Sequence, residues 1–328
     1  MRGWGKNLLR CVGLALLGLL LYRANWGLIG RSIGAAELST LFILPLLSAL
    51  MIAVRAWRWN MLLQVHCAAF SPLRAWSAYA TGVFLGAFTP GRLGDLAKAF
   101  YARQERGLQW DKALAGALLD RLFDVLFMAC LALWALLHLG VEADWDRWLG
   151  VAVGLCVISG LVFAFLWSSR RRGISFYEKG SPLGLVIAFI ATLRGELRHL
   201  TRAVSWGAWG LTFLAYSIYF TQTVYLARAM HLPLTEADVV AAIVLVGLAS
   251  FLPLSVAGLG TREGILALVM ARRAVPDSLE AALAFSALFF LFCFVVPGLM
   301  GFACFWARPF SLDALRAQTA SSLFAKDS

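Results

Sequence analysis

The chain has 328 residues, of which 61% are hydrophobic and 14% charged, and its mean hydropathy is +0.78. Because a soluble fold would have to expose much of this apolar surface to water, the composition excludes an ordinary soluble domain and indicates a membrane protein. The formal net charge of +11 also occurs in nucleic-acid-binding proteins, but Lys and Arg lie mostly in short loops beside apolar segments, so we expect no nucleic-acid partner.

The N-terminus resembles a signal peptide, with Arg2, Lys6 and Arg10 followed by an apolar stretch from Cys11 to Tyr22. No small-residue cleavage site follows promptly, and we therefore predict an uncleaved signal anchor that forms the first transmembrane helix. Apolar segments near the roughly 20 residues that a spanning helix needs predict full spans at 8–29, 38–56, 113–139, 148–167, 204–227 and 279–306.

Two further segments, 75–110 and 239–271, are better explained as hairpins that enter and leave the membrane on one side. If 75–90 crossed fully, the basic stretch from Arg170 to Arg202 would lie outside, against the positive-inside rule. The sequence thus predicts an all-α polytopic membrane protein with about six full transmembrane helices and two re-entrant helical hairpins. We expect it in a bacterial-type inner (plasma) membrane, with both termini in the cytoplasm.

Each hairpin contains a break rich in Gly, Pro and charge, Phe88–Asp95 in the first and Gly258–Gly264 in the second. The breaks are about 168 residues apart in matching surroundings, which predicts an inverted repeat, with repeat one at 38–139 and repeat two at 204–306. We expect one integral membrane domain, 1–308, with a connector at 140–203, and then a short cytoplasmic tail at 309–328. Because a bilayer tolerates broken helices only where protein buries them or water reaches them, paired breaks predict a pathway between the repeats.

Backbone freedom is concentrated at the breaks. Pro90, Gly91 and Gly94 in the first, and Gly258 and Gly260 in the second, let the chain turn and let a headgroup approach closely. The alternative interpretation is an ordinary interfacial turn.

Three charged residues follow Pro90 at helical spacing. On a helix after the turn, Arg92, Asp95 and Lys98 would form a ladder in which the carboxylate screens two cations. Cations beside a helix N-terminus favour phosphate binding. The alternative is a solvated face of a loop.

The third span contains Asp120, Arg121 and Asp124 among Ala, Leu, Phe and Met. Three ionisable groups inside a span need a partner or a cavity, and Arg262 and Glu263 on the second break have the same need. We predict that these residues bind a lipid headgroup. The alternative for the motif in the third span is a buried salt-bridge clip that holds the bundle together.

Arg55, Trp57, Arg58 and Trp59 lie at the inner end of the second span, where tryptophan anchors and snorkelling arginines are common. We therefore interpret these four residues as anchors at the membrane surface. The six cysteines are isolated, the four histidines have no partner at metal spacing, and no catalytic triad, P-loop or nucleotide fingerprint is found. We therefore expect no catalytic residue, no metal and no cofactor.

Several of these motifs together resemble the lysylphosphatidylglycerol synthase transmembrane-region family over nearly the whole chain. They are Arg55–Trp59, Pro90–Asp95 with Lys98, Asp120–Arg121 with Asp124, and Gly258–Gly264. The family comprises flippase-like proteins, among them hopanoid-associated members and the membrane part of the multiple peptide resistance factor. The resemblance implies movement or presentation of an anionic or isoprenoid-type, phosphate-bearing lipid across the inner membrane. Bifunctional members carry a soluble aminoacyl-transferase domain after the membrane part, and here we expect the flippase half alone.

Three classes of function remain open. A lipid translocator would bind a membrane lipid with an anionic headgroup at the hairpin ends, and the intramembrane charges favour it. A membrane-embedded enzyme would act on a lipid phosphate with Asp120, Asp124 or Glu263 as base, but no site for a second substrate is found. An accessory subunit would anchor a lipid-modifying enzyme or glycosyltransferase, which makes a membrane-associated lipid-synthesis enzyme a partner.

Overall fold

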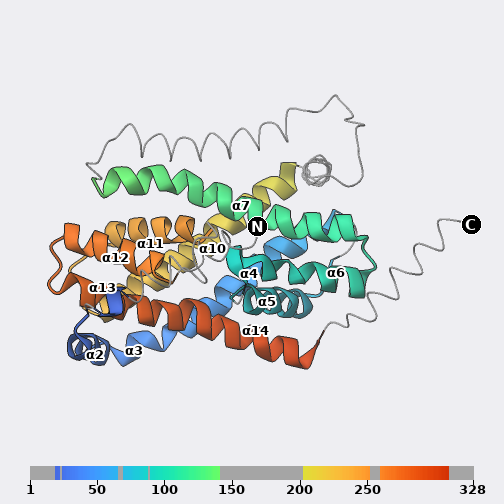
Figure 1. Ribbon diagram of the computed structural model, residues 1–328. Coiled ribbons are helices and arrows are strands. Elements are labelled where there is room, and N and C mark those ends of the chain that lie inside the picture. Colours follow the sequence, from blue (N-terminus) through green and yellow to red (C-terminus); the bar gives the residue numbers. More distant parts are fainter. Residues whose placement is uncertain are drawn as a thin grey trace, which may run out of the picture.

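A computed structural model describes residues 19–22, 24–65, 69–87, 89–140, 202–251 and 259–309 (Figure 1). Every regular element in these ranges is helical, which confirms the all-α class. The elements are α2 (Trp26–Gly34), α3 (Leu38–Leu41), α4 (Ile43–Gln64), α5 (Pro72–Ala87), the 3-10 helix η1 (Pro90–Ala97), α6 (Lys98–Arg106), α7 (Trp110–His138), α10 (Arg202–Ala229), α11 (Glu236–Phe251), α12 (Thr261–Arg272), α13 (Ser278–Phe290), the π-helix η2 (Leu291–Val295) and α14 (Val296–Ala307).

The helices form one bundle in which segments distant in sequence lie side by side. Helix α4 packs against α5 and α10, α7 against α11, α12 against α13, and α14 against α5 (Figure 1). Two helical stretches in the described ranges, Ser39–Gln64 and Ser278–Ala307, are long and apolar enough to cross a membrane. The larger apolar core joins α7 and α10 to α11, α12 and α13, and the second lies among α4, α5, α6 and the start of α7.

A π-turn interrupts the last long helix just before Pro297. The amide of Val296 donates to the carbonyl of Leu291, one residue further back than in an α-helix, and Pro297 has no amide hydrogen to donate. The carbonyl of Phe292 is thereby available, and the Ser48 hydroxyl of α4 donates to it at 2.8 Å. The proline thus creates a polar link between two helices that belong to different predicted repeats.

The first hairpin depends on a close approach of η1 to α5. A Cβ added at Gly94 would collide with the backbone of Leu85, so only glycine fits without a shift of one segment. The second hairpin consists of α11 and α12, and Gly260 precedes α12 with φ of 86°, a conformation that glycine adopts without strain. Glu263 then accepts a hydrogen bond from the Gly260 amide at 2.6 Å and caps the helix.

The predicted spans at 38–56, 113–139, 204–227 and 279–306 correspond to helices, with shifted ends. Helix α4 continues to Gln64, because the two arginines that suggested its end turn into the bundle, where Arg58 pairs with Asp120 and Asp124 and Arg55 lies beside Asp124. The predicted span at 8–29 is not one helix in its described part. Asn25 caps a new helix by accepting from the Gly27 amide at 3.0 Å. The span at 148–167 and most of the connector lie outside the described residues.

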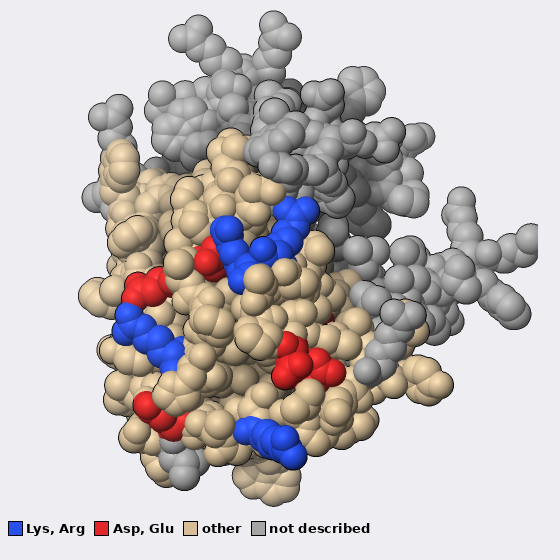
Figure 2. Space-filling model, turned by 90° about the vertical axis from the view of Figure 1, so that its left-hand side faces the viewer, with Lys and Arg blue, Asp and Glu red and all other residues tan. Residues whose placement is uncertain are grey.

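One end of the bundle carries the C-terminus of α7 and the start of α11. On this face basic and acidic side chains lie intermixed (Figure 2), with ion pairs between Arg228 and Glu236 and between Arg273 and Asp238. The Nε2 atom of His138 lies 3.0 Å from the Asp238 carboxylate, and Arg273 also donates to the His138 carbonyl at 3.1 Å. These contacts tie the ends of α7, α11 and α12 together.

Candidate functional site

Nine charged side chains gather in the interior where both hairpins meet α4 and α7. We call this group the buried charged cluster. Eight of the nine are buried, and only Arg121 is partly exposed. Its members are Arg55, Arg58, Asp95, Lys98, Asp120, Arg121, Asp124, Arg262 and Glu263.

Arg58 is fully buried and its guanidinium joins α4, α7 and α10. Its Nε donates to the Asp120 carboxylate at 2.7 Å, and its Nη1 donates to Asp124 at 2.8 Å and to the Thr212 hydroxyl at 2.7 Å. Its Nη2 donates to the backbone carbonyl of Asp120 at 3.0 Å. Because a planar guanidinium matches carboxylates in this forked geometry, Arg58 holds the three helices in a fixed register.

Lys98 contacts the carboxylate oxygen of Asp120 that Arg58 does not contact. Its ammonium forms an ion pair with the Asp120 carboxylate and lies 4.3 Å from the centre of the Tyr79 ring. The Tyr79 hydroxyl donates to the same carboxylate at 3.2 Å. Neither Lys98 nor Asp120 lines the neighbouring cavity, so this half of the cluster matches the salt-bridge clip that the sequence left as an alternative.

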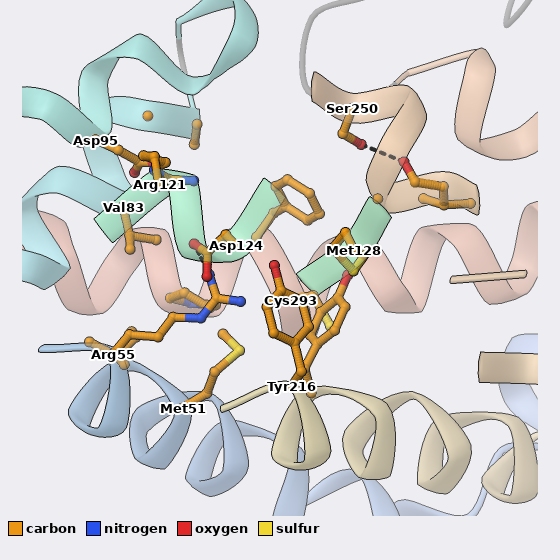
Figure 3. A pocket seen from close by; sticks show the side chains of 18 of the residues that line it. Met51, Arg55, Val83, Asp95, Arg121, Asp124, Met128, Tyr216, Ser250 and Cys293 are labelled. Atoms are coloured by element: carbon orange, nitrogen blue, oxygen red, sulfur yellow. Dashed lines mark hydrogen bonds and ion pairs between the residues drawn. The ribbon is translucent and has the colours of Figure 1, made fainter. Parts of the chain in front are cut away.

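The other half of the cluster opens into a cavity of about 80 Å³. Arg55, Asp95, Arg121, Asp124 and Arg262 all line it, together with aromatic and apolar side chains. Figure 3 shows Arg55 pointing toward Asp124, while Asp95 and Arg121 lie side by side at one edge. The carboxylate of Asp95 pairs with Arg121, and Nη1 of Arg55 lies 3.6 Å from an oxygen of Asp124.

Arg262 approaches the cavity from the second hairpin. Its Nη2 lies 2.6 Å from the Glu263 carboxylate, and its Nε donates to the Ser286 hydroxyl at 2.7 Å. The Ser286 hydroxyl donates to Glu263 at 2.6 Å, so the carboxylate is fully engaged. The guanidinium carbon of Arg262 lies 5.1 Å from the centre of the Phe290 ring, with two further aromatic rings within 6 Å.

Arg55 and Arg262 each keep one guanidinium nitrogen without a hydrogen-bond partner among the described residues, and Asp95 and Asp124 each keep one such carboxylate oxygen. Nη1 of Arg262 and Nε of Arg55 are buried and make no hydrogen bond to the described residues. A buried donor without an acceptor costs about 1–3 kcal/mol, and more when it is charged. Because both arginines line the same cavity, the geometry favours an anion placed between them.

The structure brings together some predicted residues from distant parts of the chain. Arg121 and Arg262 line the cavity with Asp95 and Asp124, although Asp95 and Arg262 belong to different hairpins. Pro90, Gly91 and Arg92 begin η1, and their side chains lie outside the described part of the structure, as does Gly258 altogether. Their predicted roles remain predictions.

The interpretation of Arg55, Arg58 and Trp59 as membrane-surface anchors is wrong. Arg58 and Trp59 are fully buried and Arg55 is 9% exposed, whereas Trp57 is 62% exposed and faces outward. The spacing of these arginines could have predicted that they are buried. Arg55 and Arg58 share a helical face at i, i+3, as Asp120 and Asp124 do at i, i+4, and two such faces can pair across a helix interface.

A family model described as "Lysylphosphatidylglycerol synthase TM region" matches residues 8–301, which is most of the chain. No curated protein sequence matches the chain. The family match covers both hairpins and all nine members of the buried charged cluster.

Proposed function

The chain belongs to the lysylphosphatidylglycerol synthase TM-region family of membrane proteins, and from this premise we propose that it moves a lipid across the inner membrane. The lipid has a phosphate-bearing anionic headgroup, which binds in the cavity lined by Arg55, Arg121 and Arg262. The tails of the lipid stay in the bilayer. Both termini face the cytoplasm in this proposal, and the two hairpins form an inverted repeat.

The observation that carries the proposal is the pair of unpartnered guanidinium donors in one cavity. Nε of Arg55 and Nη1 of Arg262 are buried without an acceptor, and they belong to the two predicted repeats. Arginine presents planar donors that match phosphate oxygens, and inside a membrane protein such a charge marks a substrate pathway more often than a scaffold.

The size of the cavity supports a headgroup rather than a whole lipid. Pockets for drug-sized ligands measure roughly 300–1,000 Å³, and this cavity measures about 80 Å³. The cavity therefore has room for a single phosphate group and for little else of the lipid. Transport then requires the cavity to open first to one leaflet and next to the other, by movement of the hairpin ends.

An embedded enzyme is the weaker alternative. A general base needs a carboxylate that can take a proton at neutral pH. Asp120 is held by Arg58, Lys98 and Tyr79, Asp124 by Arg58, and Glu263 by Arg262 and Ser286. Because basic side chains pair with all three carboxylates, none of them is available as a general base. We therefore propose that the lipid is transported without chemical modification.

The proposal is tested in proteoliposomes that contain a fluorescent phospholipid, with dithionite quenching to report which leaflet the lipid occupies. We expect Arg55→Gln and Arg262→Gln to lower the protein-dependent transfer rate at least about tenfold, because each removes a charged donor from the cavity. Arg31→Gln, at an exposed position of α2, is the matched control and should transfer at the wild-type rate. Wild-type rates in both cavity variants would reject the proposal, and mass spectrometry of the recovered lipid would reveal any chemical change.

A further inference from the structure

An apolar groove of about 290 Å³ lies between α7 and α10, away from the buried charged cluster. Each of the two helices contributes three residues at i, i+4 and i+7, which share one helical face, and α11 contributes one more. The lining residues are Phe127, Leu131 and Trp134 of α7, Phe213, Ser217 and Phe220 of α10, and Val240 of α11. Apart from the serine, all of these side chains are apolar or aromatic.

The groove is separate from the charged cavity and open to the outside of the described bundle. Phe127 of the groove is stacked on Tyr216 of the cavity, with ring centres 4.8 Å apart, and no described residue lines both spaces. On the outer side, Phe213 is 66% exposed and Trp134 is 39% exposed. Two large rings therefore remain uncovered by the described part of the chain.

The chain leaves α7 and enters α10 at opposite ends of the bundle. The C-terminal ends of both helices lie beside the start of α11, because His138 contacts Asp238 and Arg228 pairs with Glu236. Helix α10 has 28 residues, so its first residue, Arg202, lies about 42 Å from that end. The chain between the two helices that line the groove must therefore pass from one end of the bundle to the other.

Residues 141–201, which lie outside the described part, contain one apolar run long enough for this passage. The run 148–167 has no charged residue and would span about 30 Å as a helix, whereas the apolar run 183–193 is too short. Only residues 141–147 precede the longer run, and an extended chain of that length reaches about 25 Å. The run must therefore begin close to the end of α7.

The sequence of this run suits a groove lined by large rings. Gly150 and Gly154 are four positions apart and would share one face of a helix. In membrane proteins, small residues on such a face let a neighbouring helix approach closely. The glycines of the run would thus provide space for the protruding rings of Trp134 and Phe213.

We propose that the groove between α7 and α10 is the docking surface for residues 148–167 of the same chain, which pack there as a membrane-spanning helix antiparallel to α7. The covalent link to α7 gives this segment a high effective concentration at the groove, an advantage that a lipid tail or a second copy of the chain lacks. The docked segment bridges the last span of predicted repeat one and the first span of predicted repeat two. It lies outside both hairpins and leaves them free to move.

The first test uses the wild-type protein in liposomes and a membrane-soluble diazirine that labels side chains in contact with lipid. Phe302 on α14 is the matched control, because it is also a phenylalanine in a long apolar helix and is only 41% exposed, against 66% for Phe213. We expect mass spectrometry to find Phe213 labelled at least about fivefold less than Phe302, since a packed helix leaves no room for the reagent. Equal or stronger labelling of Phe213 would show a groove filled by lipid and would overturn the proposal.

The second test identifies the segment that covers the groove. In the full chain without native cysteines, Phe213→Cys is combined with single cysteines at successive positions of 148–167 and oxidised with copper phenanthroline. We expect disulfides within one chain at every third or fourth position, as one face of a helix requires. Trp134→Cys lies nearer the end of α7, so its disulfides should shift toward residue 148. Phe302→Cys is the control and should form none.

The outcomes separate the possible occupants of the groove. Disulfides found only between two chains would assign the groove to a second copy, and equal yields from Phe302→Cys would indicate random collision; either result would overturn the proposal. If the cysteine variants fail to fold, the labelling of the wild-type protein still decides whether the groove is covered. Neither test measures transport, so a failure of the proposed lipid transport would leave this inference unchanged.

Discussion

Arg55 and Arg58 lie three positions apart on α4 and have different surroundings. Arg58 is held by two carboxylates, a hydroxyl and a backbone carbonyl, and its burial is matched by hydrogen bonds on every side. Arg55 lies nearer the cavity, stacks on the ring of Tyr216 at 4.9 Å and keeps a nitrogen without an acceptor. Arg58 therefore stabilises the fold, whereas Arg55 keeps a donor that a ligand could bind.

This division predicts the effect of removing Arg58. Arg58→Met would leave Asp120 and Asp124 buried with fewer partners, and breaking a buried ion pair from one side costs about 3–5 kcal/mol. We expect a large fall in Tm in detergent, measured by differential scanning fluorimetry. Arg31→Met at an exposed site should change stability by less than about 0.5 kcal/mol. An unchanged Tm for Arg58→Met would show that the clip contributes nothing to stability.

At the scale of the elements, the turn of the first hairpin depends on contact between two backbones. A Cβ at Gly94 would meet the carbonyl group of Leu85, so η1 would have to move away from α5. We expect Gly94→Ala to lower the free energy of unfolding by about 1–3 kcal/mol and to reduce transport through displacement of Asp95. Gly30→Ala has open space around the new methyl group and should be neutral or slightly stabilising. Equal stability of the two variants would argue against a tight turn.

The end of the bundle formed by α7, α11 and α12 should respond to acid. Burial works against ionisation of Asp238, but hydrogen bonds from Thr235 and the nearby Arg273 and His138 outweigh it and lower the pKa of Asp238 below its usual value. A lowered carboxylate pKa contributes stability that is present above the unfolded-state value of about 3.9 and is lost as the pH falls through the folded-state value. Melting temperatures measured from pH 7 to pH 3 should therefore fall less steeply below pH ~4 in Asp238→Asn than in the wild type. Parallel curves would show that this carboxylate plays no part.

At the scale of the whole molecule, the two larger apolar cores of the described residues flank a polar junction. One core joins the second hairpin to α7, α10 and α13, the other joins the first hairpin to α4, and the buried charged cluster lies where they meet. Because packed apolar cores resist deformation, we expect relative movement at the cavity side of the junction, where the contacts are fewer than around Arg58. In the transport proposed above, the cavity would open at this junction first to one leaflet and then to the other.

The predicted topology places the basic part of the connector, Arg170 to Arg202, in the cytoplasm and the turn between α12 and α13 on the opposite face. In a background without native cysteines, Ser175→Cys should react with a membrane-impermeant maleimide only when the cytoplasmic face is accessible. Pro276→Cys, exposed in that turn, should react only from the other face. Labelling of both positions from one side would contradict the inverted arrangement of the hairpins.

The sequence by itself determined the membrane class, the helical fold, the two broken segments and most of the charged residues that meet in the cavity. These features are local, since apolar length, Gly and Pro content and charges inside apolar runs can be read from consecutive residues. Only the tertiary structure decided which charges pair. Arg58 and Asp120 are 62 positions apart and Asp95 and Arg262 lie on different hairpins, so their meeting depends on the rotation and packing of whole helices. For the same reason the sequence misplaced Arg55 and Arg58, because an arginine near the end of an apolar run reaches water or turns inward according to the carboxylates that a neighbouring helix presents.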